Sequence, residues 1–408
     1  MQDYYDFTVI GGGASGMAAA VTAASYGDRV LLIEKNNSLG RKISASGNGR
    51  CNLMNSGKNR YWGDSLFAEK ILNSFPFESL IHFWNEIGIL LTEENEGRMY
   101  PCTFQSSTVT DAYKTVLRIS GVKIFLQTEV KSVEKKENTF HIISDDHVFH
   151  SGRVLIACGG PAYPRLGGTD SGSRILSKFG HSIIPMIPAL CPLRTDTRSI
   201  SGLSGIRVRC SVKLNKANGT SPIKERGEVL FTDKGLSGIC VMQTARFADA
   251  GDIIELNLVD RIIPDHNKLI ALLLHRQRMF GCFPPETILN GILVPRLSYA
   301  VLKQAMIEMK GRTAGDLSYE EIRRISDKCR SYLLTVTGNC GMDEAQVTAG
   351  GADCNDFDPK NMQSRLVQGL FASGEVLNVD GDCGGFNLMF ATASGILAGM
   401  NNRKETGI

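Results

Sequence analysis

The stretch Phe7-Thr8-Val9-Ile10-Gly11-Gly12-Gly13-Ala14-Ser15-Gly16 decides the fold of this chain. A short apolar run leads directly into three glycines, and small residues continue to position 24. This order predicts a buried strand, a tight turn and a helix, as in a dinucleotide-binding site. Gly11 permits the turn, Gly13 lets the backbone approach a pyrophosphate, and Gly16 allows close packing of the helix on the strand. The helix opening at Ala14 and Ser15 offers free N–H groups to the anion.

A second apolar run, from Arg29 to Ile33, ends in a carboxylate at Glu34. A carboxylate in this position accepts hydrogen bonds from the hydroxyls of an adenosine ribose. The glycine turn therefore has the strand, the helix and the acid that a nucleotide site needs. These features predict a nucleotide cofactor but do not say which dinucleotide is bound.

Composition describes a chain of 408 residues, 42% of them hydrophobic, with a net charge of +3. The basic residues are scattered in short clusters such as Arg207/Arg209, so we expect no nucleic-acid partner. No apolar run of membrane-spanning length occurs, so we expect no membrane partner and a cytoplasmic location. Eleven cysteines without a CxxC pair fit reduced thiols. The seven histidines show no HxH or HExxH spacing, and no metal is expected.

The order of predicted elements suggests an interrupted α/β domain. Residues 65–90 have helical spacing, residues 122–158 alternate as a β-meander, and the polar stretch 41–52 is predicted as a loop. We predict three segments: 1–188 as the first part of the cofactor domain, 189–340 as an insert, and 341–408 as the last part. Within the insert, the expected strands are 206–214, 228–232, 253–258 and 332–337, and the expected helices are 267–279, 297–309 and 319–330.

Three distant segments, residues 7–16, 154–160 and 370–385, each have an apolar strand that runs into glycines. A site for NAD needs mainly the first, whereas an enclosed FAD needs more of the chain. The Gly384-Gly385 turn before a helix suits the pyrimidine edge of a flavin, where a helix N-terminus stabilises the negative charge of the reduced ring. The sequence therefore favours FAD over NAD as the bound cofactor.

Six ordered motifs resemble a known family: GGGASG (11–16), RKISASGNGRCN (41–52), GRMYP (97–101), ACGGPAYPRLGGTDSG (157–172), GEVLFTDKGLSG (227–238) and GLFASGEVLNVDGDCGGFNLMFATASG (369–395). The chain resembles bacterial FAD-dependent oxidoreductases that include aminoacetone oxidase and a bile-acid reductase flavoprotein. The resemblance covers nearly the whole chain. It implies an α/β fold, with a split Rossmann-like FAD-binding domain and an inserted domain of β-barrel and helical parts.

The resemblance also implies a role for individual residues. The first turn would hold the pyrophosphate, and Glu34 would bind the adenosine ribose. Arg41 and Lys42 would lie by the adenosine–phosphate half, and Lys35 is also implied to bind the cofactor. The flavin would lie against the loop of residues 47–52 and the start of the last helix. The remaining residues implied to bind FAD are Gly47, Asn48, Asn52, Val130, Ala157, Gly159, Gly374, Glu375, Gly385, Phe386, Asn387 and Leu388.

Flavin chemistry needs a hydride donor and an acceptor, and the chain has no second GxGxxG with its own strand and acid. NAD(P)H would therefore visit the flavin briefly, after which a conjugated C=C bond of a small molecule, such as a 3-oxo steroid or bile acid, accepts the hydride. Alternatively, a substrate amine reduces the flavin and O₂ reoxidises it. An RNA-modifying flavoprotein is a third class. For the first route, Tyr163 is a candidate proton donor and Arg50 a candidate oxyanion stabiliser. The sequence leaves the oligomeric state open.

Overall fold

A parallel sheet of short, fully buried apolar strands forms the centre of the first unit of this protein. The computed structural model describes residues 4–58 and 60–400. One unit comprises the described residues up to Pro188 and from Ala345 onward, and the other comprises Ala189–Glu344. The strands of the large sheet are β1 (Tyr4–Ile10), β2 (Val30–Ile33), β7 (Lys123–Phe125), β8 (Val130–Lys136), β9 (Thr139–Ser144), β10 (Val148–Ile156) and β19 (Leu370–Ala372).

The strand order is β7-β2-β1-β10-β9-β8, and β19 also pairs with β10. The pairs β7–β2, β2–β1, β1–β10 and β10–β19 are parallel, whereas β8, β9 and the first half of β10 are antiparallel. The parallel strands place their carboxyl ends at one edge, where open α/β sheets bind ligands. The segments that follow β1, β2, β10 and β19 contain most of the predicted cofactor residues, so the topology brings them to this edge.

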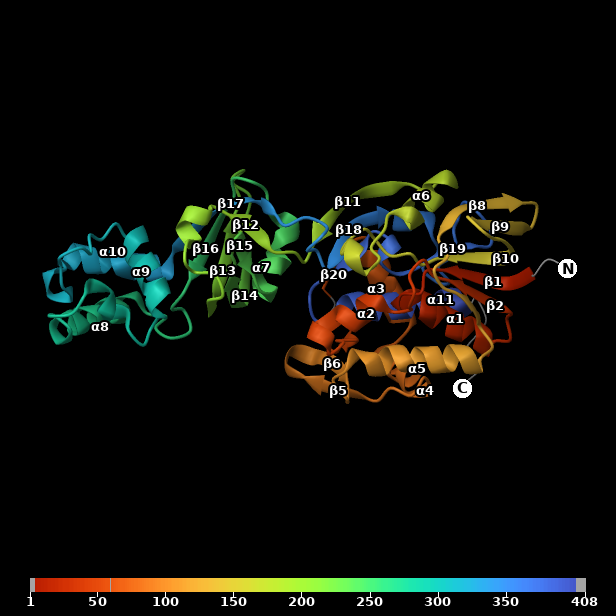
Figure 1. Cartoon of the computed structure of the whole chain (residues 1–408), viewed down its shortest axis with the longest axis horizontal. Helices are drawn as coiled ribbons and strands as arrows, with labels where there is room; N and C mark the ends of the chain where they lie inside the picture. The colour runs from red at the N-terminus through yellow and green to blue at the C-terminus, as the bar shows by residue number, and fades with distance from the viewer. Residues whose placement is uncertain (1–3, 59, 401–408) are drawn as a thin grey trace. The chain divides into compact units, whose positions relative to one another are not determined.

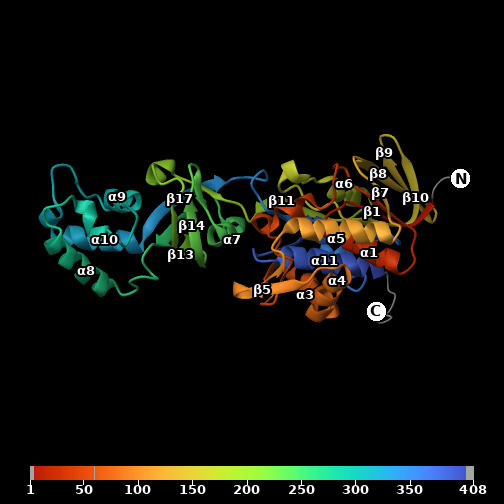
Figure 2. The ribbon, with the colours of Figure 1, turned by 60° about the horizontal axis from the view of Figure 1, so that its bottom comes forward.

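Helices cover this sheet, and two of them join the chain's distant ends. Glycines of α11 allow the approach to α1, because a Cβ on Gly395 would lie 2.2 Å from the Ser15 carbonyl oxygen and one on Gly399 would lie 2.6 Å from that of Ala19. Figures 1 and 2 both show α1 beside α11. The helices of this unit are α1 (Ala14–Ser25), α2 (Arg41–Ala45), α3 (Ser65–Ser74), α4 (Phe77–Glu86), α5 (Ser106–Ile119), α6 (Ser171–Lys178) and α11 (Phe386–Met400).

Three small sheets complete the first unit around the cofactor edge. They pair β3 (Met54–Asn55), β6 (Arg98–Pro101) and β5 (Leu91–Glu94); β4 (Tyr61–Gly63) and β20 (Val379–Gly381); and β11 (Ile183–Ala189) and β18 (Val347–Ala352). The β4–β20 pair ties the segment before α11 to residues from the first third of the chain. This pairing positions the start of α11.

The second unit is a closed barrel with helices attached. The barrel order is β12-β15-β14-β13-β16-β17, and helices α8, α9 and α10 pack together. The predicted fold class, a split Rossmann-type domain with an inserted barrel and helices, is thereby confirmed. The elements are β12 (Leu193–Thr195), β13 (Arg207–Asn215), β14 (Ile223–Phe231), β15 (Gly235–Ser237), α7 (Ile239–Thr244), β16 (Ile253–Asn257), α8 (His266–Met279), α9 (Pro295–Gln304), α10 (Tyr319–Arg330) and β17 (Tyr332–Asn339).

Four local expectations were wrong. The stretch 41–52 is not all loop, because α2 forms one short turn whose single buried side chain, Ile43, shows no period. Helix α9 ends at Gln304 rather than at 309, since the backbone is left-handed at Met306, with φ of 55°. Strand β14 begins earlier than 228, because its charged first half masks the alternation. Strand β7 pairs in parallel with β2 instead of joining a meander. No described helix is long and apolar enough to cross a bilayer.

Candidate cofactor and active site

The turn between β1 and α1 leaves a space that the protein itself does not fill. Gly11 has φ of 113°, and a Cβ there would lie 2.3 Å from the carbonyl oxygen of Ala157. A Cβ on Gly16 would lie 1.9 Å from the Gly11 carbonyl oxygen, so helix and strand touch at this glycine. Gly13, the N-cap of α1, has no atom within 4 Å of the position that its Cβ would take. Here the helix N-terminus, with Ala14 and Ser15, faces open space that suits a pyrophosphate.

Glu34 lies at the end of β2, as predicted, and it is buried. Its carboxylate accepts hydrogen bonds from the backbone N–H of Gly12 at 2.7 Å and of Asn36 at 2.8 Å, and from the Asn36 side-chain amide. Asn36 in turn accepts a bond of 2.8 Å from Arg41. The network therefore holds the predicted ribose acid against the glycine turn. Sequence reasoning missed Asn36, although it lies two residues beyond the acid.

Lys35 and Val130 lie near the same end of β2. Lys35 follows Glu34 and is half-buried, and Val130 is the buried first residue of β8. The backbone N–H of Thr128 donates to the Glu34 carbonyl oxygen at 3.0 Å, which brings this segment to the edge of the parallel sheet. Both predicted residues therefore lie beside the adenosine end of the expected site.

Lys42 and Glu375, predicted separately, form an ion pair of 3.1 Å. Glu375 also accepts a bond of 2.9 Å from the backbone N–H of Thr348. Gly374 packs against Ser15, because a Cβ there would lie 2.6 Å from the Ser15 hydroxyl oxygen. Gly159, with φ of 70°, has only Glu375 near its Cβ position, at 3.9 Å. The ends of β10 and β19 thus meet the first helix at one place.

The loop of Gly47 and Asn48 is held in an unusual backbone conformation. Gly47, Asn48 and Cys51 have φ of 58°, 55° and 60°. Glycine adopts this left-handed region freely and asparagine tolerates it, so the conformational cost falls mainly on Cys51. The side-chain oxygen Oδ1 of Asn52 is buried and has no hydrogen-bond partner among the residues that the structure describes. A buried acceptor left without a donor costs about 1–3 kcal/mol, and it indicates a missing ligand.

The start of α11 lies directly beside this orphaned acceptor. Gly385 has φ of 104°, and its Cβ would lie 2.7 Å from Asn52 Oδ1 and 2.3 Å from the Met54 carbonyl oxygen. Asn387 has its own partners, since its amide exchanges bonds of 2.8 Å with the backbone N–H and carbonyl of Gly381. Phe386 is buried, and Leu388 is half-buried. Asn387 therefore braces the turn with its side chain.

These residues fit FAD at both ends. The open space at Gly13 and the N-terminus of α1 suit the pyrophosphate, and the Glu34 carboxylate suits the ribose. At the other end, Asn52 Oδ1 can accept a hydrogen bond from an N–H group of the flavin, and the N-terminus of α11 can face its pyrimidine edge. FAD, when bound here, supplies hydride transfer between two substrates.

The two catalytic candidates from the sequence lie in different surroundings. Arg50 is half-buried, pairs with Glu94 at 2.8 Å, and lies over the ring of Tyr100 at 4.6 Å. Tyr163 is 37% exposed and has a left-handed backbone with φ of 57°. Within the described part of the chain, Arg50 and Tyr163 share no hydrogen bond, ion pair or ring contact.

Tyr100 is a residue that sequence reasoning did not assign. It is buried, and its ring lies 3.7 Å from the Cβ position of Gly47. Burial raises the pKa of the Tyr100 phenol, and the neighbouring Arg98 and Arg50 lower it in part. Across residues 4–58 and 60–400, its hydroxyl has no hydrogen-bond partner. The GRMYP motif contains this tyrosine, but the alternating pattern of a strand gives no sign of a free phenol beside the cofactor.

Fold and site together define a flavin-dependent oxidoreductase with a Rossmann-type cofactor domain. The family model described as the HI0933-like protein Rossmann domain matches residues 5–401. The chain belongs to this HI0933-like family, and it is an FAD-dependent oxidoreductase.

Two curated relatives span nearly the whole chain. The 3-dehydro-bile acid delta(4,6)-reductase of Clostridium scindens is 33% identical over 402 residues, covering 96% of this chain and 97% of that protein. The ribosomal RNA dihydrouridine synthase of Escherichia coli is 29% identical over 398 residues, covering 96% of each chain. Among solved structures, 3-ketosteroid-delta4-(5alpha)-dehydrogenase from Rhodococcus jostii RHA1 covers 99% of this chain and 98% of its own at 14% identity, with a TM-score of 0.50. That likeness is one of fold.

Asn52 either binds the cofactor or supports the fold. Replacing it distinguishes these roles by whether the apoprotein becomes more or less stable. Replacing Asn52 with leucine removes an unsatisfied buried acceptor, so the apoprotein should keep or gain stability. FAD affinity should fall about tenfold, because a charge-free hydrogen bond of roughly 1.4 kcal/mol is lost. Denaturant unfolding of the apoprotein and FAD titration measure the two quantities.

Asn387→Leu is the matched control, since its amide already bonds Gly381. It should destabilise the apoprotein by about 1–3 kcal/mol. If Asn52→Leu destabilises the apoprotein by as much as the control does, Asn52 is a structural residue.

Proposed function

We propose that this enzyme reduces a C=C bond conjugated with a carbonyl group, using NAD(P)H as the hydride donor. The two relatives of full length support this reaction class. A delta(4,6)-reductase of a 3-dehydro-bile acid and a dihydrouridine synthase both saturate a C=C bond conjugated with a carbonyl. In the reaction proposed here, a hydride adds to the carbon β to the carbonyl, and a proton adds to the α carbon. Such an enzyme needs an acid and a group that stabilises the enolate oxygen.

The observation that carries the proposal is the free phenol of Tyr100, with the Arg50 guanidinium over its ring. Tyr100 lies beside the Gly47 turn, with its ring 3.7 Å from the Cβ position of Gly47. Its raised pKa keeps the phenol protonated at neutral pH, so that Oη can donate a proton to the α carbon. Arg50, which pairs with Glu94, places its guanidinium over the Tyr100 ring, where its remaining N–H groups can donate to an oxyanion. Tyr163 is retained as a second candidate acid.

The hydride donor has no separate domain among the described residues. The second unit is a barrel with helices and has no parallel sheet with a glycine turn. NAD(P)H therefore binds transiently at the cofactor face and leaves before the acceptor binds.

Anaerobic mixing tests the donor. The yellow protein is mixed with NADH, NADPH or aminoacetone, and the visible flavin absorption is followed. Rapid bleaching by a pyridine nucleotide supports the proposal. Bleaching by the amine with none by either nucleotide would replace the reductase with an amine oxidase.

Tyr100→Phe should separate the two half-reactions. Removing the phenol hydroxyl should lower the steady-state rate of NAD(P)H-dependent reduction of a conjugated acceptor by about 10²–10⁴-fold, the usual contribution of a general acid. Anaerobic reduction by NAD(P)H should stay within about twofold of wild type, since no proton from Tyr100 is needed. Because burial raises the phenol pKa of Tyr100, wild-type turnover should hold through neutral pH and decline only at pH values above the ordinary pKa of a tyrosine.

Tyr163→Phe is the matched variant, with the same atom removed from the other candidate. If Tyr163→Phe loses the turnover and Tyr100→Phe keeps it, the acid is Tyr163.

A further inference from the structure

The register of the barrel gathers basic side chains that are scattered in the sequence. Strand β13 alternates between buried apolar residues and an outer row that includes Arg209, Ser211 and Lys213. Ser211 pairs with Arg226 of β14, and Lys213 pairs with Lys224. Side chains directly opposite in neighbouring strands share one face. Strands β13 and β14 thus build a basic outer face that the linear order of residues hides.

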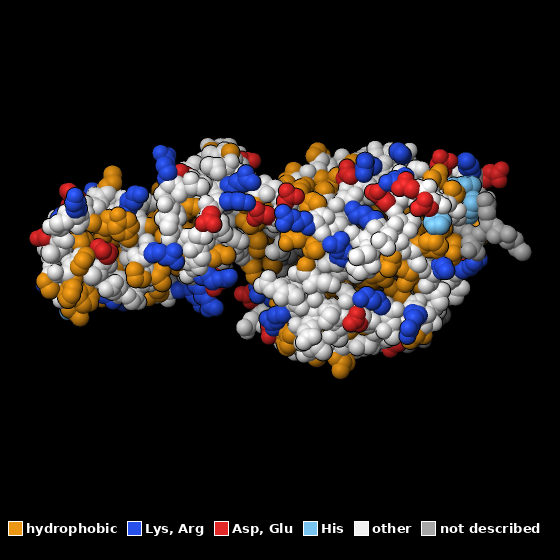
Figure 3. Space-filling view, in the orientation of Figure 1, with side chains coloured by type: hydrophobic (Ala, Val, Ile, Leu, Met, Phe, Trp, Pro, Cys, Tyr) orange, Lys and Arg blue, Asp and Glu red, His pale blue; other side chains and the backbone are white. Residues whose placement is uncertain are grey.

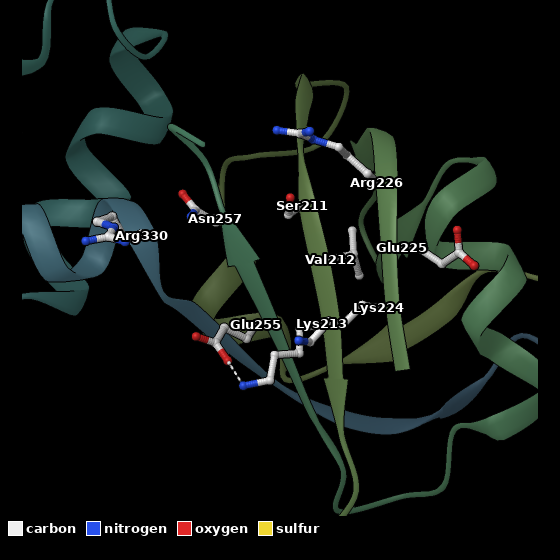
Figure 4. A pocket seen from close by; sticks show the side chains of 9 residues that line it. All are labelled: Ser211, Val212, Lys213, Lys224, Glu225, Arg226, Glu255, Asn257 and Arg330. Carbon is white, nitrogen blue, oxygen red and sulfur yellow. Dashed lines mark hydrogen bonds and ion pairs between the residues drawn. The ribbon is translucent and has the colours of Figure 1, made fainter. Parts of the chain in front are cut away.

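Two adjoining depressions mark this face. The larger, of about 500 Å³, is lined by β13, β14 and β16, with Arg330 from the end of α10 (Figure 4). The smaller, of about 350 Å³, is lined by Arg207, Arg209 and Arg261, with apolar side chains such as Ile262 and Val294. Figure 3 shows Lys and Arg side chains gathered over β13 and β14. We call the two depressions together the basic barrel face; its cations are Arg207, Arg209, Lys213, Lys224, Arg226, Arg261 and Arg330.

The basic barrel face has more positive charge than its acids neutralise. Arg207 pairs with Glu228, Lys213 with Glu255 at 3.2 Å, and Arg226 with Asp260 at 2.7 Å. In the described parts of the chain, no carboxylate forms an ion pair with the remaining four: Arg209, Lys224, Arg261 and Arg330. Two further acids lie near this face. Glu225 lines the larger depression, and the positive charge of Arg330 helps to lower the pKa of Asp265.

Two further observations favour a bound anion. The Nε of Arg330 is buried, and no acceptor within residues 4–58 and 60–400 bonds it. Residues 189–344 contain 22 Lys and Arg against 17 Asp and Glu, a net charge of +5 in a chain whose total is +3. The remaining residues therefore carry −2, and the positive charge is concentrated in the second unit. Such asymmetry is typical of a surface that binds a polyanion.

We propose that the basic barrel face binds the phosphate backbone of an RNA. Guanidinium groups match phosphate oxygens in pairs, and arginine supplies five of the seven cations. The side-chain amide of Asn257 adds a hydrogen-bond donor between them, and the apolar wall of the smaller depression can cover a base or ribose. The inference deepens the proposed function and rests on it for the reacting group, because uridine contains a C=C bond conjugated with a carbonyl. One full-length relative is named for such a product in ribosomal RNA.

Fluorescence anisotropy with the full-length protein and a short labelled RNA hairpin with a uridine-rich loop tests the proposal. Arg209→Glu/Arg261→Glu should weaken binding at least tenfold at 0.1 M salt, and the slope of log K against log salt should fall by about one to two. Arg209→Gln/Arg261→Gln should weaken RNA binding less, because it removes the two positive charges without adding negative ones. Lys70→Glu/Lys178→Glu makes the same change of charge in the first unit and should stay within about twofold of wild type.

Three results would overturn the proposal. They are equal losses in the two charge-reversal variants, binding of Arg209→Glu/Arg261→Glu as tight as wild type, and binding to phosphatidylserine vesicles without binding to the RNA. Bleaching of the flavin by NAD(P)H, measured on the same preparations without RNA, reports the proposed function alone. A failure of either proposal is therefore visible separately from a failure of the other.

Discussion

Replacing Gly13 with aspartate is expected to remove FAD from the protein and leave the apoprotein as stable as wild type. The backbone of Gly13, at φ −83° and ψ −170°, is one that any residue adopts, and its Cβ position has no atom within 4 Å. Aspartate is also a preferred N-cap, so α1 should not lose stability. Its carboxylate would occupy the space of the pyrophosphate and repel it. We expect FAD affinity to fall by at least about 1,000-fold, or roughly 4 kcal/mol.

Gly13→Asn is the matched variant, because it has the same shape and N-cap preference without the charge. FAD affinity should fall about 100-fold in this variant, because the asparagine side chain occupies the space of the pyrophosphate without repelling its charge. Flavin content after gel filtration and thermal unfolding of the apoproteins measure both effects. A yellow Gly13→Asp protein with one flavin per chain would show that the pyrophosphate lies elsewhere.

Gly385→Ala is expected to have the second-largest effect, for a different reason. The Gly385 backbone, with φ of 104°, disfavours any side chain, and its Cβ would lie 2.3 Å from the Met54 carbonyl oxygen. The start of α11 must move, and with it the backbone groups that face the flavin. We expect less than about one-tenth of the wild-type flavin content, with a lowered unfolding temperature, because left-handed strain alone costs roughly 1–2 kcal/mol.

Gly121→Ala serves as the control, since its φ is 71° and nothing lies within 4 Å of its Cβ position. It should lose a similar amount of stability from strain and keep its FAD. Equal flavin contents in the two variants would mean that the turn at Gly385 does not contact the cofactor.

The cofactor end of the site could be predicted from sequence because its signals are local. A strand, a glycine turn and a helix follow each other within ten residues, and Glu34 ends the next strand. Gly11 and Gly16 make the close contacts that the motif requires. The pairing of Lys42 with Glu375 joins residues far apart in the chain, and only the folded sheet shows it.

Tyr100 and the basic barrel face depend on packing that the linear order of residues hides. Tyr100 lies on a short strand, and nothing nearby in sequence indicates that its hydroxyl has no partner. The basic barrel face depends on strand register, which brings β13 and β14 together across a turn and adds α10 from a hundred residues further on. The short helix α2 lacks a detectable period because it has a single buried side chain.

The central claim is that a C=C bond conjugated with a carbonyl accepts the hydride. The most direct measurement is a single turnover under argon, in which protein reduced with NADPH is mixed with a 3-oxo-Δ4 steroid acid or a uridine-containing RNA. A saturated 3-oxo steroid acid is the control acceptor. We expect the absorption of oxidised flavin to return with at least one of the two conjugated acceptors, and that acceptor to gain two hydrogen atoms. With the saturated control, the flavin should stay reduced and the steroid unchanged. Flavin absorption that returns only when O₂ is admitted, with both conjugated acceptors recovered unchanged, would contradict the central claim.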